Sequence, residues 1–174
     1  MRQHHQTRAG AARPALDRHG VPLLAGVPPR GARIAVLAST FNGAIVDRLA
    51  DGALDALREA GMAPADLLFV QVAGAWELPQ LAARLAAAGR CDAIVAVGCV
   101  IRGDTSHYDV IVNESARGLM QVAIEHRLPV ANGVLACEDE EQAWARAGGA
   151  GGNKGAEAAA AALALLSVLR AADV

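Results

Sequence analysis

The chain has 174 residues, of which 53% are hydrophobic and only 3% aromatic, so we expect one domain with a core of Ala, Val, Leu and Ile. Its net charge of −2 argues against nucleic-acid binding across the whole molecule. Three cysteines without a CxxC pair favour reduced thiols in a cytoplasmic protein over a disulfide framework or a zinc site. No apolar run approaches the roughly 20 residues of a membrane span, so no membrane partner is expected.

Residues 1–32 form the first expected segment, a flexible leader rich in Arg, Pro and Ala. Five arginines against one aspartate give residues 1–30 a charge of +4, which leaves −6 for the rest of the chain. A basic, acid-poor segment of this kind is typical either of a disordered terminus or of an organelle transit peptide. Residues 33–174 form the second expected segment, the domain itself.

Strand and helix alternate four times after the leader. The expected strands are Arg33–Ala38, Leu67–Val72, Asp92–Val97 (ended by Gly98) and Pro129–Leu135. Five helices are expected: from about 44 to 60, over about ten residues before Gly89, from Thr105 onward, from Glu138 to Ala147, and from Gly155 to about 170. Thr105 is the expected N-cap of the third helix. The apolar residues on one face of that helix are Val112, Ala116, Leu119, Met120 and Ala123. Gly148–Gly152 reads as a break. The alternation predicts an α/β three-layer sandwich, a four-stranded parallel sheet with helices on both faces, in the flavodoxin-like arrangement.

Right-handed crossovers place all four strand-to-helix turns at one edge of this sheet, where ligands bind open α/β sheets. These turns hold Phe41-Asn42, Trp76-Glu77, Gly103–His107 and Asn132-Gly133. The stretch Gly98–His107 joins a strand end, a glycine turn and a helix start, whose free N–H groups suit a phosphate. His107 would stand beside that phosphate. A lone histidine is more often a packing or capping residue, and that alternative stays open.

The other candidates also have two interpretations. Phe41 and Trp76 could stack on a flat heterocycle or simply pack. Glu77 could accept hydrogen bonds from a ligand or cap a helix, and Arg146 could bind a phosphate or compensate a helix dipole.

Taken together, five motifs resemble those of the 6,7-dimethyl-8-ribityllumazine synthase family. They are Ser39-Thr40-Phe41-Asn42, Gly74–Pro79, Gly98–Asp109, Asn113-Glu114 and Arg146–Gly155, in that order over roughly residues 32–170. The resemblance implies a transferase of riboflavin biosynthesis that condenses 5-amino-6-(D-ribitylamino)uracil with 3,4-dihydroxy-2-butanone 4-phosphate to the lumazine, phosphate and water. It implies no metal and no organic cofactor.

The resemblance also assigns roles to residues of this chain. His107 would be the catalytic proton shuttle, with imidazole suited to transfers near neutral pH. Phe41 would stack on the pyrimidinedione, and Trp76 and Glu77 would frame the ribityl chain. The remaining substrate contacts would come from Ala75, Val100, Ile101, Asn132 and Lys154, and the phosphate contacts from Gly103, Asp104, Thr105 and Arg146. Because family sites lie between subunits, Arg146 and Lys154 would come from the neighbouring chain.

At three positions this chain has a residue that bears on how a substrate would bind. Asn132 stands where many members carry an aromatic or bulky apolar residue, which predicts a polar contact in place of a second ring contact. Trp76 stands where Phe is commoner. The Asp104 side chain is expected to turn away, so that only its backbone binds phosphate.

The resemblance further implies a homo-oligomer that uses small-molecule substrates, with riboflavin synthase as a candidate partner. Family members form pentamers, some packed as twelve pentamers into an icosahedral shell. The Gly148–Gly152 break has no insertion, as in shell-forming members, while the long leader leaves the assembly open. Two alternatives stand beside the enzyme: a flavodoxin-like module that binds flavin or lumazine without turnover, and a cage-forming paralogue with an idle site.

Overall fold

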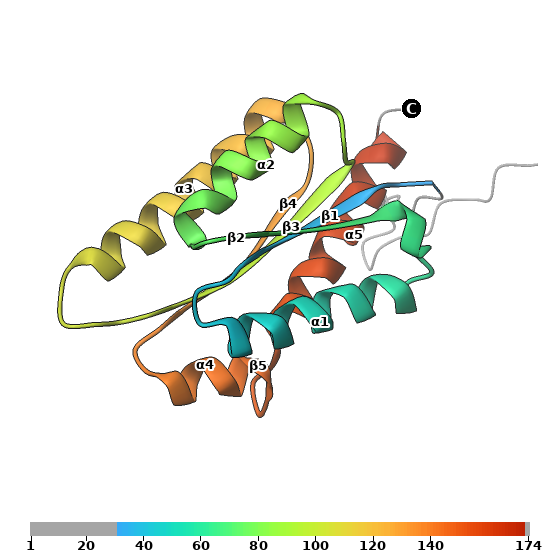
Figure 1. Ribbon diagram of the computed structural model, residues 1–174. Helices are drawn as coiled ribbons and strands as arrows, with labels where there is room; N and C mark the ends of the chain where they lie inside the picture. Colours follow the sequence, from blue (N-terminus) through green and yellow to red (C-terminus); the bar gives the residue numbers. More distant parts are fainter. Residues whose placement is uncertain (1–30, 173–174) are drawn as a thin grey trace, which may run out of the picture.

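The structure, a computed structural model, describes residues 31–172 (Figure 1). Residues 1–30, most of the expected leader, lie outside the described residues. The sheet contains β1 (Ile34–Ser39), β2 (Leu67–Val72), β3 (Ala93–Ile101) and β4 (Val130–Cys137), all parallel, in the order β2-β1-β3-β4. The helices are α1 (Gly43–Glu59), α2 (Leu78–Ala87), α3 (His107–His126), α4 (Glu140–Arg146) and α5 (Lys154–Ala172), with 3-10 turns η1 (Pro64–Asp66) and η2 (Ala75–Glu77).

Helices cover both faces of the sheet, which confirms the predicted three-layer sandwich. Helices α1 and α5 lie on one face of the sheet, and α2 and α3 lie on the other (Figure 1). β1 lies in the middle and is buried at every position, because its alternate side chains enter the two opposite cores.

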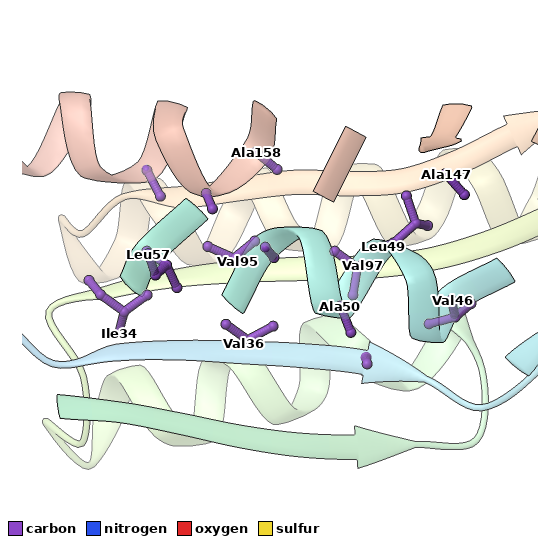
Figure 2. Packing of buried hydrophobic residues seen from close by; sticks show 14 of the residues in the cluster. Ile34, Val36, Val46, Leu49, Ala50, Leu57, Val95, Val97, Ala147 and Ala158 are labelled. Atoms are coloured by element: carbon purple, nitrogen blue, oxygen red, sulfur yellow. The ribbon is translucent and has the colours of Figure 1, made fainter. Parts of the chain in front are cut away.

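Small residues bring α1 and α5 close together over the sheet. Figure 2 shows this core, to which Val36 and Val95 from the strands and Leu49 and Leu57 from α1 all belong. Gly155 touches the backbone of α1 so closely that a Cβ at this position would overlap the Leu49 carbonyl. The contact leaves no room for a ligand between these helices.

α5 is the one helix within residues 31–172 that is long and apolar enough to cross a membrane, by length and composition alone. This differs from the sequence expectation that no run approaches such a span. Its apolar residues have another use, because Ala159, Ala162 and Leu166 are buried against α1 and the sheet. One face of α5 therefore belongs to the core.

The prediction that Gly98 ends the third strand is wrong. β3 continues to Ile101, since residues 98–101 stay paired with residues 134–137 of β4. A Cβ at Gly98 would lie 3.0 Å from Ser39 Oγ, so the glycine permits close packing against β1 rather than a turn.

The predicted buried face of the third helix is also partly wrong. Met120 is 61% exposed, whereas Ser115, Leu119 and Val122 are buried. Ser115 can enter the core because its hydroxyl donates a hydrogen bond to the Val112 carbonyl at 3.2 Å.

The glycine-rich segment after α4 is a small hairpin rather than an irregular break. β5 (Ala147–Gly149) pairs antiparallel with β6 (Gly152–Asn153). Gly148 and Gly152 have φ values of 104° and 75°, a region that glycine adopts at little cost. Asn153 ties the hairpin to α1, because its Nδ2 donates to the Arg48 carbonyl at 2.8 Å.

Candidate functional site

A pocket of about 490 Å³ opens at the carboxyl edge of the sheet, on the side of α2 and α3. The turns after β1, β2 and β3 and the start of α3 meet at this end of the sheet (Figure 1). The pocket is lined by nine of the predicted site residues: Phe41, Ala75, Trp76, Glu77, Val100, Ile101, Gly103, Thr105 and His107. Its volume suits a small molecule of the size of a heterocycle with a polyol chain.

The turn after β1 presents Phe41 to the pocket. Hydrogen bonds from the Phe41 N–H to the Ala73 carbonyl, 3.0 Å, and from the Thr40 N–H to the Val72 carbonyl, 2.8 Å, hold the turn against the end of β2. Asn42 has a φ of 57°, and its Nδ2 donates to the Cys99 carbonyl at 3.0 Å. Asn42 had no predicted role, although asparagine before a helix is among the few residues that tolerate this conformation.

The η2 turn adds Trp76 and Glu77. Trp76 is 45% exposed and Phe41 is 71% exposed, so neither ring is committed to the core. Exposed aromatic rings that line a pocket favour the stacking alternative over plain packing. Glu77 fulfils its capping role, because its Oε2 accepts a 2.8 Å hydrogen bond from the Gly74 N–H, and it lines the pocket as well.

The loop between β3 and α3 brings Gly103, Thr105 and His107 to the same pocket. Thr105 is not the N-cap that sequence analysis predicted. The N-cap position is Ser106, and Thr105 Oγ1 accepts only a long 3.4 Å hydrogen bond from the His107 N–H. Asp104 is exposed and is not among the lining residues, whereas Tyr108, which had no predicted role, is.

Asn132 and Lys154 lie elsewhere, in a second pocket of about 390 Å³ between β4 and α5. Asn132 is not at the carboxyl edge as predicted, because β4 extends to Cys137 and Asn132 pairs with Ala96 in mid-sheet. Its Oδ1 accepts a 3.0 Å hydrogen bond from the Val134 N–H. The Lys154 ammonium binds the Glu157 carboxylate at 2.7 Å.

Arg146 lines neither pocket. It is the last residue of α4, it is exposed, and one guanidinium N–H donates to the Gln142 carbonyl at 2.9 Å, an ordinary contact at a helix C-terminus. Within residues 31–172, the two pockets share no lining residue. One copy of the described chain therefore does not bring Arg146 or Lys154 to the pocket that holds His107.

The thiols next to the site are not nucleophiles at neutral pH. Cys99 lines the pocket, and burial raises the pKa of its thiol to about 12, with smaller contributions from Cys137 and Glu140. Burial also raises the pKa of the Tyr108 hydroxyl, which stays protonated at neutral pH. Within residues 31–172, no three His, Cys, Asp or Glu side chains form a group that could hold a metal ion.

The sequence of this domain is similar to those of known proteins. A family model described as 6,7-dimethyl-8-ribityllumazine synthase matches residues 31–170. A curated relative of that name from Stenotrophomonas maltophilia is 52% identical over 122 residues, which cover 70% of this chain and 79% of the relative. Relatives of the same name from Chlorobium phaeobacteroides and Desulfovibrio desulfuricans are 46% and 44% identical over 119 residues, covering 68% of this chain and 77% and 76% of their own lengths. The chain therefore belongs to the 6,7-dimethyl-8-ribityllumazine synthase family.

Proposed function

We propose that the pocket around His107 is the catalytic site in which this transferase of riboflavin biosynthesis joins 5-amino-6-(D-ribitylamino)uracil to 3,4-dihydroxy-2-butanone 4-phosphate. The products are 6,7-dimethyl-8-ribityllumazine, inorganic phosphate and water. The observation that carries the proposal is the convergence of two exposed aromatic rings, a carboxylate, a helix start and a histidine on one pocket.

The uracil ring is assigned to the part of the pocket that Phe41 lines. An exposed ring at the pocket wall can stack on a flat heterocycle, and backbone groups of Val100 and Ile101 can bond its polar edge. Trp76 and Glu77 frame the ribityl chain. One oxygen of Glu77 is occupied by the Gly74 N–H, which fixes the carboxylate so that its other oxygen can accept hydrogen bonds from ribityl hydroxyls.

The phosphate is assigned to the start of α3, where Gly103 and Thr105 line the pocket. The first N–H groups of a helix have no partner within the helix and favour an anion. Asp104 stays outside the lining, so its negative side chain does not face the phosphate, and its backbone is the part assigned to binding.

The reaction then follows from the two bound substrates. The 5-amino group attacks the ketone, and loss of water leaves an imine. Removal of a proton next to the imine expels phosphate and forms an enol, which tautomerises to a ketone. The ribitylamino nitrogen attacks this ketone, which closes the second ring, and loss of a second water completes the lumazine. His107 moves the protons, since imidazole both accepts and gives a proton near neutral pH. Orientation of the two substrates supplies much of the remaining acceleration.

A second copy of the chain is proposed to complete the site. Arg146, Lys154 and Asn132 lie away from the pocket of their own chain, which supports their use in the pocket of a neighbour. There Arg146 would bind phosphate, Lys154 would reach the ring, and Asn132 would offer a polar contact. Pentamers, their assembly into a shell and a partnership with riboflavin synthase belong to the same proposal.

The protein is further proposed to be cytoplasmic, with its catalytic domain in residues 33–174. All three cysteines are free and buried, which supports a reducing compartment. A binding module or a cage-forming paralogue remains the second candidate, and it would bind lumazine or flavin without forming product.

Replacement of His107 by alanine tests the catalytic assignment. His107→Ala should lower turnover by about 10² or less, while substrate binding measured by calorimetry is retained. His126→Ala, which changes an exposed histidine at the other end of α3, is the matched control and should turn over like the wild type. A His107→Ala variant that no longer binds either substrate would show that the assigned role is wrong.

Co-assembly of two slow variants tests the shared site. When His107→Ala and Arg146→Ala chains are co-expressed in equal amounts, about one quarter of the sites between subunits combine an intact His107 with an intact Arg146. Lumazine formation should then recover to about one quarter of the wild-type rate. If each site is built from one chain, the mixture will only average the two slow rates.

A further inference from the structure

Helix α3 begins at the proposed catalytic histidine without the usual side-chain cap. The N-cap residue, Ser106, makes no side-chain hydrogen bond to the helix, and the contact from Thr105 Oγ1 to the His107 N–H is long at 3.4 Å. His107 itself is exposed, and within residues 31–172 its ring makes no hydrogen bond. The direction of the ring therefore depends on how firmly the first turn of α3 is held.

Arg102 holds that turn from outside the pocket. Its terminal nitrogens donate to both carboxylate oxygens of Asp109, at 3.2 and 3.3 Å. Its guanidinium carbon lies 4.0 Å from the centroid of the Tyr108 ring. The two residues that follow His107 are thus both bound by one side chain, in the forked geometry that only arginine offers.

Arg102 is in turn fixed to the neighbouring strand. Its Nε donates to Glu138 Oε2 at 2.8 Å, and its backbone N–H donates to the Cys137 carbonyl at 2.9 Å. The arginine therefore links the first turn of α3 to the end of β4, a rigid part of the sheet. The hydrogen bonds to Asp109, and then the one to Glu138, raise the pKa of Arg102, so its guanidinium stays charged at any working pH.

The contacts of Arg102 should matter for the orientation of His107 more than for the stability of the fold. Tyr108 lines the pocket, whereas Arg102, Asp109 and Glu138 do not. The side chains of Asp109 and Glu138 are 53% and 59% exposed, and ion pairs this exposed contribute little to folding. The Arg102 guanidinium nevertheless fixes the orientation of the first turn of α3. It contacts three side chains, those of Tyr108, Asp109 and Glu138, and each contact restricts how this turn can rotate.

We propose that Arg102 is a positioning residue of this enzyme: by clamping Tyr108 and Asp109 against Glu138, it fixes His107 over the reacting atoms. The inference rests on the proposed role of His107. Arg102 does not line the pocket, so its removal should change the turnover number rather than the binding of the uracil.

The test is a kinetic comparison of Arg102→Gln with the wild-type protein in its native assembly. Turnover should fall about tenfold, while KM for 5-amino-6-(D-ribitylamino)uracil changes less than about twofold. The midpoint of thermal unfolding should stay within about 3 °C. Arg102→Lys keeps the charge but loses the fork, and should recover part of the turnover. A large rise in KM without a fall in kcat would overturn the proposal.

Arg58→Gln is the matched control. It removes another exposed arginine, which pairs with Asp55 at 2.9 Å near the end of α1 and lines neither pocket. Its turnover should equal that of the wild type. A loss as large as that of Arg102→Gln would show that removal of a surface ion pair is enough to cause the effect, which contradicts a positioning role.

The double variant separates this inference from the proposed function. If Arg102 acts through His107, then Arg102→Gln with His107→Ala should be no slower than His107→Ala alone. If the double variant instead shows the product of the two single losses in turnover, Arg102 acts independently of His107. That result overturns the inference but keeps the role of His107. Normal turnover of His107→Ala would remove the proposed role itself, and the inference with it. A slow His107→Ala with a normal Arg102→Gln would overturn the inference alone.

Discussion

The two faces of the sheet are built for opposite purposes. On the face of α1 and α5, Gly155 lies against the Leu49 carbonyl, and the helices pack without space between them. On the face of α2 and α3, Phe41 and Trp76 remain exposed at the carboxyl edge beside a pocket of about 490 Å³. The first face holds the fold together, and the second leaves side chains free to meet a ligand.

The comparison predicts that substitutions on the two faces fail in different ways. A change in the contact between α1 and α5 should reduce stability and affect activity only through unfolding. A change at the open edge should reduce binding or turnover and leave stability nearly unchanged.

The largest effect is expected at the packed face. Gly155→Ala should lower the free energy of unfolding by about 3 kcal/mol, because the new methyl group overlaps the backbone of α1, which cannot move aside. Urea unfolding followed by circular dichroism measures the change. Gly43→Ala at the start of α1 is the control, since a Cβ there meets nothing within 4 Å, and it should be neutral. Equal stability of both variants would mean that the two helices are not tightly packed.

An intermediate effect is expected at the open edge. Phe41→Ala should raise KM for 5-amino-6-(D-ribitylamino)uracil about tenfold through the lost stacking, with a change in unfolding free energy of less than about 0.5 kcal/mol. Steady-state kinetics measure the change in KM, and urea unfolding measures the change in the free energy of unfolding. Phe69→Ala, which changes an aromatic residue of β2 that is 43% exposed and lies outside the pocket lining, should leave KM unchanged. An unaltered KM in Phe41→Ala would remove the stacking assignment.

The smallest effect concerns Cys99, at the base of the pocket. Its pKa is raised from an ordinary 9.0 to about 12, so the folded state binds the proton more tightly than the unfolded state. The resulting stability is complete well below pH 9 and is lost as the pH rises toward 12, by about 1.4 kcal/mol at pH 10. Cys99→Ala should lose less stability than the wild type between pH 8 and pH 10. If the variant and the wild type lose equal stability over this pH range, the Cys99 thiol does not contribute to the pH dependence of stability.

The sequence was enough to predict most of the fold, because each strand is an apolar run and each helix has helical spacing. The errors came from tertiary contacts. Gly98 looks like a strand end, but it serves close packing against Ser39, and the hydroxyl of Ser115 enters the core only because the Val112 carbonyl accepts its hydrogen bond.

The candidate site was predictable where the turns follow the strands directly. Phe41, Trp76 and His107 meet in one pocket because the parallel strands end at one edge. Asn132 was misplaced because an Asn-Gly pair is typical of a turn, whereas Asn132 and Gly133 stay paired with Ala96 and Val97 inside the sheet. The network around Arg102 could not be seen in advance, because it joins residues 102 and 138 across two strands.

The central claim is that this pocket forms 6,7-dimethyl-8-ribityllumazine, and the most direct measurement mixes the purified protein with both substrates. Lumazine absorbance and phosphate release are followed together. We predict product formation well above the rate without protein, with about one phosphate released for each lumazine, as expected when the protein orients both substrates. No acceleration, combined with tight binding of lumazine or flavin, would contradict the claim and identify a binding paralogue.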